Sequence, residues 1–357
     1  IGLIVWRVAD GSLKSKADVD SIVSREGVFL LNNLLLLGCV GVVMFGTLGE
    51  KISAYFWQET KYTAPWFNAW MVPGGLALIV LMGIGPLIPW RKVTLKSLKK
   101  NFLIPTVVSF VATVLVYLSD AYHIQEHIAS THVPFGDVPL GRIPLVAELT
   151  GVYALIGFYG VFFVTYTLGV EFYRGAHIRA KNAKESLGAA LLGLLAKQKR
   201  RYGGYLTHLG FAGLFLGFIG TGLKTEQDLK FSAVGDTHVI EGPQLTYAGM
   251  KKFSSREYAE DFAEFKLARL NDDGTVGEEL GVLRPSRRRY HGANVRLSRT
   301  TTEKDEVFLL KGNVYLSLTA YDPMAGQWAE VKAHFNPMLI FMWLGGALLL
   351  IGVGFAL

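Results

Sequence analysis

The chain has a single cysteine, Cys39, among its 357 residues. An intramolecular disulfide therefore cannot form, and a metal site made of several thiolates is excluded for this chain alone. Because Cys39 lies inside an apolar run, we expect its thiol to be a packing group.

Several catalytic signatures are also absent from the sequence. It contains no hydrolase triad motif, no phosphate-binding glycine loop and no pair of carboxylates on an apolar background. No segment combines basic and aromatic residues in the pattern of a nucleic-acid surface, so we expect no nucleic acid partner. There is no internal repeat either, which disfavours a transporter.

Charge is scarce in six long apolar runs of a chain that is 51% hydrophobic. Five of these runs are about as long as the roughly 20 residues that a helix needs to cross a bilayer, and the fourth is longer. The sequence therefore predicts a polytopic α-helical membrane protein with six complete spans. The predicted spans are Val28–Leu48, Trp70–Trp90, Phe102–Leu118, Ile143–Phe172, Tyr205–Leu223 and Pro337–Leu357.

Basic residues are concentrated in alternate connections between these spans. Arg7–Arg25, Arg91–Lys100 and Arg174–Arg201 carry 4, 5 and 8 lysines and arginines, whereas the intervening loops hold Lys51, Lys61 and Arg142. Cytoplasmic loops are rich in basic residues, so the three basic connections are predicted to be cytoplasmic. In the third, residues 174–201, basic and apolar residues alternate as in an amphipathic helix lying on the inner membrane surface.

A polar region, Lys224–Asn336, separates the last two predicted spans. Its 16 lysines and arginines nearly balance its 17 aspartates and glutamates, unlike the basic remainder of the chain. Short runs rich in β-branched and aromatic residues alternate here with turn sequences such as NDDG and DPMAG. We expect a small antiparallel β sandwich or barrel facing outward, inserted between a membrane part at 1–223 and a last span at 337–357.

Histidines are the residues of greatest chemical interest. His208 lies inside the fifth predicted span, where an imidazole is costly to bury without a metal, a cofactor iron or another polar partner. A histidine at the membrane interface with one hydrogen bond is the alternative, because the basic residues that precede this span indicate nearby water.

Two polar clusters lie in the predicted outward regions. His123, His127 and His132 occur in one loop, the first two at helical i, i+4 spacing, which suits a divalent metal or a haem iron. The run RPSRRRY, which includes Arg287 and Arg288, could pair with carboxylates such as haem propionates. A polar surface loop and a solvated strand with local ion pairs are the respective alternatives.

Several motifs in order resemble one known family. They are SREGVFLLNNLLLL with GTL, PWFNAWMVPG, LMGIGPLIPWRK, LTHLG and, in the last span, WLGGALLLIG. Together with the outward β domain, they are similar to the C-terminal half of the CcmF family, the haem lyase subunit of cytochrome c maturation, or its close relative in nitrite reductase assembly. The SRE...LLNN and MGIGPL...WR motifs are the most specific of these.

The resemblance implies covalent attachment of haem to the CXXCH motif of an apocytochrome c, outside a bacterial or archaeal inner membrane. In that family, a histidine of the HLG-containing span is an axial ligand of haem b, and His208 is the matching position. The implied partners are apocytochrome c, a haem chaperone and an apocytochrome-presenting protein. The tryptophan-rich WWD segment that precedes these motifs in the family is not among the 357 residues, so a separate chain carrying it is expected if the protein is split rather than truncated.

Two functions follow from these observations. The first is the haem-b-bearing part of a cytochrome c haem lyase; the second is a non-catalytic membrane scaffold that displays a β domain to a haem protein or respiratory complex. A transporter is a third, weaker alternative. A b-type haem spectrum of the purified protein would separate the first from the other two.

The charge distribution yields a testable topology. A cysteine introduced into residues 224–336 should react with a membrane-impermeant thiol reagent in whole cells, because the basic connections hold the opposite side in the cytoplasm. Labelling that requires cell lysis would show that the predicted orientation is wrong.

Overall fold

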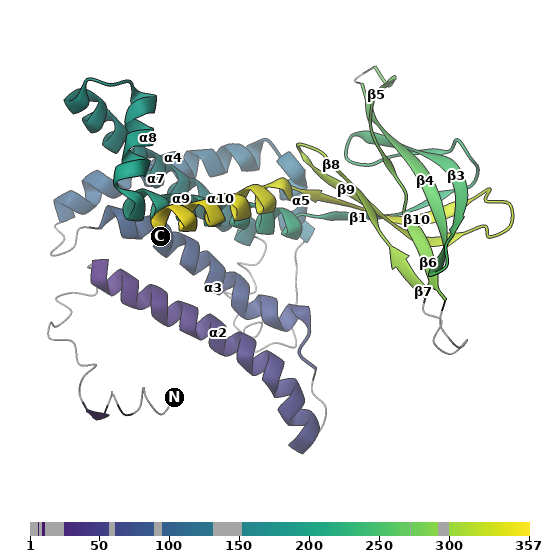
Figure 1. Ribbon diagram of the computed structural model, residues 1–357, viewed down its shortest axis with the longest axis horizontal. Coiled ribbons are helices and arrows are strands. Elements are labelled where there is room, and N and C mark those ends of the chain that lie inside the picture. The colour runs from purple at the N-terminus through teal and green to yellow at the C-terminus, as the bar shows by residue number, and fades with distance from the viewer. Residues whose placement is uncertain are drawn as a thin grey trace. The chain divides into compact units, whose positions relative to one another are not determined.

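The computed structural model describes residues 6, 9–10, 25–56, 61–88, 95–130, 152–271, 273–291 and 300–357. The chain divides into two compact units. The first unit comprises residues 1–119, 128–209 and 352–357, and the second comprises residues 120–127 and 210–351. Figure 1 labels the helices and strands of both units.

The long helices overlap the predicted apolar runs, although α7 extends to Ala183, beyond the predicted end at Phe172. They are α2 (Arg25–Phe56), α3 (Ala64–Ile84), α4 (Leu95–Leu118), α7 (Tyr153–Ala183), α8 (Leu187–Lys197), α9 (Lys199–Gly222) and α10 (Ile340–Ala356). A short helix, α5 (Ile124–Ser130), and two 3₁₀ turns, Gly85–Leu87 and Ala121–His123, complete the helical elements of the described residues. The first of these turns ends α3 at Gly85–Pro86, as the glycines and prolines there indicate.

Five of the described helices are long and apolar enough to cross a membrane: α2, α3, α4, α7 and α9. The chain is thus a multi-pass membrane protein, but the predicted sixth complete span is corrected to a 17-residue helix, α10. Such a helix is about 26 Å long, slightly less than the hydrocarbon core. It is short because β10 continues to Pro337 and a turn follows, with Met338 at φ 58°.

The helix α7 packs against α3 through reciprocal contacts between bulky side chains and glycines. Ile79 of α3 lies on the bare backbone of Gly160, and the ring of Phe163 of α7 lies on that of Gly83. Both bulky side chains are almost completely buried. On α2, Cys39 is a free thiol that lies beside Gly74 of α3, consistent with a packing role.

The segment 174–201 is not the single amphipathic helix that its pattern predicts. Residues 174–183 continue α7, which ends at Lys184 in a left-handed conformation with φ 55°. The side chain of Ser186 then caps α8 by accepting a hydrogen bond from the Ala189 amide at 3.3 Å. After α8 the chain turns at Gln198 and enters α9. The segment therefore forms the end of one helix, a separate short helix and the start of another.

Glycines bring α9 and α10 into backbone contact. In the first unit, Gly203 lies against Gly352 and Ala356, and in the second, Gly210 lies against Gly345 and Leu349. The same α9 face continues in the second unit through Gly213, Gly217 and Gly220. Small residues at such spacing allow helix backbones to approach closely within a membrane. We call this row of contacts the glycine seam.

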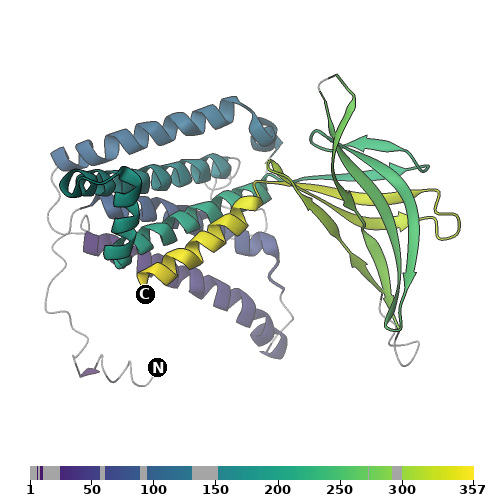
Figure 2. The same cartoon turned by 45° about the horizontal axis from the view of Figure 1, so that its top comes forward.

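The β domain consists of two antiparallel sheets, seen in Figures 1 and 2. One has the order β1-β10-β9-β8 and the other β2-β3-β4-β6-β7, with β5 paired to β4. The strands are β1 (Thr225–Phe231), β2 (Thr237–Val239), β3 (Pro243–Ser254), β4 (Tyr258–Leu270), β5 (Val276–Leu283), β6 (Ser286–Tyr290), β7 (Thr300–Glu303), β8 (Asp305–Phe308), β9 (Gly312–Tyr321) and β10 (Ala329–Pro337).

A single apolar core lies between side chains of the two sheets. Phe231, Leu316 and Val331 come from the first sheet, and Tyr247 and Phe265 come from the second. This arrangement confirms the predicted small antiparallel domain inserted before the last helix. The run RPSRRRY supplies β6.

The glycine seam can be tested by adding one methyl group. In Gly210→Ala, the new Cβ would overlap the backbone nitrogen of Leu349, so the two helices must separate. We expect a loss of about 1–3 kcal/mol, measured as a lower thermal midpoint of the detergent-solubilised protein.

Gly354→Ala is the matched control, since a Cβ at this α10 position meets no atom within 4 Å. Its midpoint should be unchanged or slightly higher, because alanine is the better helix former. Equal midpoints for wild type and Gly210→Ala would contradict the close backbone contact.

Candidate functional site

His208 is the tenth residue of α9 and lies half-buried within the first unit. Its Nδ1 atom is buried, and neither ring nitrogen is hydrogen-bonded to a residue that the structure describes. Four residues earlier on the same face, Gly204 leaves open space where a Cβ would project. The hydrogen bond expected of a simple interface histidine is thus missing among the described residues.

The glycine seam and His208 lie on opposite faces of α9. Gly210, Gly213 and Gly217 follow His208 by two, five and nine residues, and a helix turns about 100° per residue. These glycines therefore accommodate α10 rather than a group bound at His208. The imidazole is left on a side of the helix that α10 does not cover.

A charged cluster lies one to two turns before His208. The Arg201 guanidinium donates to Glu171 Oε2 of α7 at 2.7 Å and to the Tyr205 hydroxyl at 3.1 Å. Arg201, Tyr205 and His208 are spaced four and three residues apart, so they share one face of α9. That spacing was visible in the sequence, where Arg201 had been interpreted as a topology signal alone.

Glu171 was also missed by sequence reasoning. It lies within the membrane-length helix α7, and 18% of its side chain is exposed. Glu171 is therefore an ionisable residue inside a long apolar helix, in addition to His208. The partner of Glu171, Arg201, comes 30 residues later, so spacing along one helix could not indicate their pairing.

The loop with three histidines is partly described. His123 ends the 3₁₀ turn Ala121–His123, and its Nε2 lies 3.2 Å from Glu241 Oε2. Glu241 in turn accepts a hydrogen bond from the Thr225 hydroxyl at 3.1 Å, while Tyr122 packs on the β-domain core. This stretch thus belongs to the second unit. His127 lies in α5 with its side chain outside the described residues, as is all of His132.

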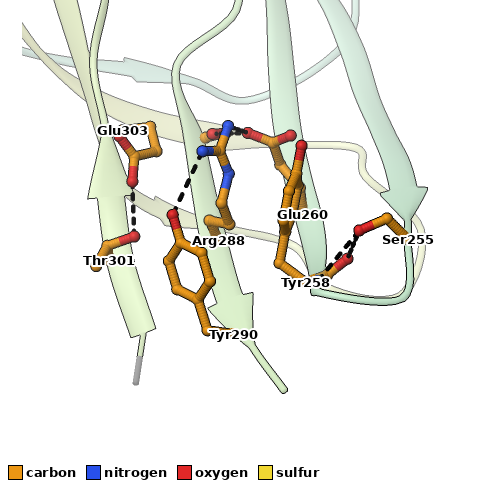
Figure 3. A network of polar contacts seen from close by, with 8 residues as sticks. Ser255, Tyr258, Glu260, Arg288, Tyr290, Thr301 and Glu303 are labelled. Atoms are coloured by element: carbon orange, nitrogen blue, oxygen red, sulfur yellow. Dashed lines mark hydrogen bonds and ion pairs between the residues drawn. The ribbon is translucent and has the colours of Figure 1, made fainter. Parts of the chain in front are cut away.

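The arginines of β6 are engaged in contacts within the β domain. Arg288 donates to Glu260 Oε1 at 3.0 Å and lies over the Tyr258 ring at 4.3 Å from its centroid, as Figure 3 shows. Arg287 donates to the Thr319 carbonyl of β9. Local ion pairs therefore exist in this run, and a carboxylate ligand of Arg288 would have to compete with Glu260.

His334 is a buried ionisable residue that its sequence position did not reveal. Its ring stacks on Tyr315 with centroids 4.2 Å apart, and 10% of its side chain is exposed. Burial lowers the pKa of His334, and the nearby lysines 224, 332 and 304 lower it further, whereas Glu226 at 3.3 Å opposes them. The domain therefore favours the neutral imidazole.

The chain is similar to several curated proteins over nearly its whole length. It is 26% identical to the cytochrome c-type biogenesis protein CycK of Bradyrhizobium diazoefficiens, across 92% of this chain and 44% of that protein. It is 25% identical to CcmF of Pseudomonas fluorescens, across 91% of this chain and 42% of that protein. With the protein ccl1 of Rhodobacter capsulatus, 23% identity covers 100% of the chain and 47% of the relative.

One solved structure shares the fold. It is named cytochrome c haem lyase CcmF, and it covers 99% of this chain with a TM-score of 0.61 and 20% identity. The chain corresponds to 49% of that structure and spans less than half the length of the curated relatives above. No family model matches. The predicted resemblance to the C-terminal half of CcmF proteins is thereby confirmed.

The depressed pKa of His334 predicts how stability depends on pH. An unfolded histidine takes up a proton near pH 6.5, whereas the buried ring resists protonation, so stability should fall as pH drops below about 6.5. One such group contributes a slope of at most about 1.4 kcal/mol per pH unit. Hydrogen exchange of β1 and β10 amides in the full-length protein would measure it.

His334→Phe retains an aromatic ring beside Tyr315 and should flatten this slope. His291→Phe, at an exposed position after β6, is the control and should leave it unchanged. The same acid slope in both variants would show that His334 is not its source.

Proposed function

From the likeness to CcmF proteins, we propose that this chain is the haem-b-bearing part of a cytochrome c haem lyase. In this proposal it assists the reduction and covalent attachment of haem to a CXXCH apocytochrome. The single observation that carries the proposal is the His208 imidazole. It lies in a membrane-length helix without a hydrogen bond to any described residue.

The residues around His208 fit an iron porphyrin. Its imidazole would hold the iron, and ligation would offset the cost of placing that ring within a membrane helix. Gly204 leaves space on the same face for a flat ligand. Arg201, about 10 Å along the helix axis from His208, offers a guanidinium to a carboxylate.

When bound, the haem would supply one-electron chemistry. The chain's own residues would fix its position and its surroundings. His208 would hold the iron, and Glu171 keeps the Arg201 side chain oriented through their 2.7 Å contact. By family resemblance, the second axial ligand would come from outside this chain.

The β domain would face outward, towards the apocytochrome, from an inner membrane. The basic connections between spans support this orientation, since such loops remain in the cytoplasm. A haem chaperone, an apocytochrome-presenting protein and a chain with the WWD segment would complete the assembly. His123, His127 and His132 would then lie on the reaction side.

Arg287 and Arg288 are further candidates for contacts with substrate haem. Their contacts with the Thr319 carbonyl and Glu260 hold both guanidinium groups on the β sheet. Propionate binding there would replace an existing partner. The proposal therefore depends on His208 and not on these arginines.

Replacing His208 tests the proposal directly. His208→Ala should abolish or strongly weaken the b-type haem spectrum of the purified protein, because the variant lacks the axial nitrogen. Membrane insertion should persist, since alanine suits an apolar helix. The amount of protein extracted from membranes would measure insertion, and absorbance spectra of equal amounts of that protein would measure bound haem.

His177→Ala is the control, because this imidazole lies on α7 and stacks on Tyr173, away from the α9 sequence. Its haem spectrum should match wild type. An unaltered spectrum in His208→Ala would show that the assignment is wrong, and a colourless wild-type protein would favour the scaffold alternative.

A further inference from the structure

An open groove of about 500 Å³ lies between the end of α7, α8 and the start of α9. Two arginines, Arg179 and Arg201, line it together with the amides Asn182 and Gln198. Neither amide forms a side-chain hydrogen bond with a described residue. The side-chain amides of Asn182 and Gln198 can therefore still donate hydrogen bonds to a ligand in the groove.

The two arginines are held in place by carboxylates of the same unit. Arg179 Nε lies 2.6 Å from Glu185 Oε1, and the guanidinium rests against Gly193 of α8. Arg201 is paired to Glu171. Each guanidinium retains further N–H groups, because a guanidinium carries five donors and each carboxylate contact uses one or two. The positions are fixed and still able to bind an anion.

Lysines adjacent in sequence to the groove-lining residues carry positive charge without an ion-pair partner among the described residues. Residues 181 and 184 flank the lining pair 182–183, and residues 197 and 199 flank Gln198. All four are exposed lysines, and none forms an ion pair with a residue that the structure describes. An anionic ligand would therefore find an excess of cations.

Apolar side chains are exposed beside these cations. Ile178 lines the groove and is 60% exposed, while Leu187 and Leu192 of α8 are 48% and 68% exposed. Soluble phosphate would bind the cations but leave the apolar side chains exposed to water. A phospholipid would contact the cations with its phosphate and the apolar side chains with its acyl chains, as lipids do at amphipathic helices on membrane surfaces.

We propose that the groove between α7, α8 and α9 binds the phosphate headgroup of an anionic phospholipid. Arg179, Arg201, Asn182 and Gln198 contact the headgroup, the exposed lysines attract it, and Ile178 contacts an acyl chain. This site shares Arg201 with the surroundings of His208, but it does not depend on the proposed lyase function. It fixes the bend between α7 and α9 through a bound lipid.

Native mass spectrometry of the detergent-solubilised full chain can test this site. Phosphatidylglycerol and phosphatidylcholine are titrated separately into wild type and into Lys181→Gln/Lys197→Gln/Lys199→Gln. The variant keeps both arginine–carboxylate pairs, so its fold should be retained. Its phosphatidylglycerol adduct should weaken roughly tenfold or more, because each cation near an anionic headgroup contributes about fivefold.

The control is Lys266→Gln/Lys311→Gln, which removes exposed lysines of the β domain and should bind as wild type does. Inorganic phosphate at millimolar concentration is added as a competitor and should displace little lipid. Equal binding of the two lipids, unchanged binding by the triple variant, or full displacement by phosphate would each overturn the proposal. Arg179→Gln, judged folded by its thermal midpoint, should bind the anionic lipid more weakly than wild type.

Discussion

The structure depends on the close approach of two helix backbones. Gly220 of α9 lies against the Pro337 carbonyl at the beginning of the turn into α10, and Gly217 lies against Met342. Directly beyond this contact, β1 and β10 pair in antiparallel register, from Thr225 with Phe335 to Phe231 with Ala329. Helix packing and strand pairing thus hold the two ends of the β domain together at one place, and any side chain at position 220 would disrupt both.

Because α10 packs against one face of α9, the opposite face of α9 can hold polar side chains. Backbone contact needs glycine on one face, and the residues of the opposite face are then free of packing against α10. His208 lies on this opposite face, with Arg201 and Tyr205 spaced towards the basic end and tied to Glu171 of α7. A single helix thereby combines a structural face and a polar face.

Helices and strands could be predicted because their signals are local. Apolar length located α2, α3, α4, α7 and α9, and turn residues located the inserted β domain. Three features could not be predicted because they depend on contacts distant in sequence. The ring of His334 is buried by Tyr315, the Arg201 guanidinium meets a carboxylate 30 residues earlier, and β10 extends to Pro337 through its pairing with β9, which shortens the last helix.

The candidate site was predicted only in part. His208 was identified from its apolar surroundings and its family motif, whereas only the structure shows that it has no hydrogen bond to a described residue. The glycines at 210, 213 and 217 pack against α10. The adjacent ends of the β domain have one more consequence. The end of α9 and the start of α10 are neighbours, so residues 224–336 occupy the place of a short loop in a helical hairpin. This part could therefore be acquired, exchanged or enlarged during evolution without altering the two helices.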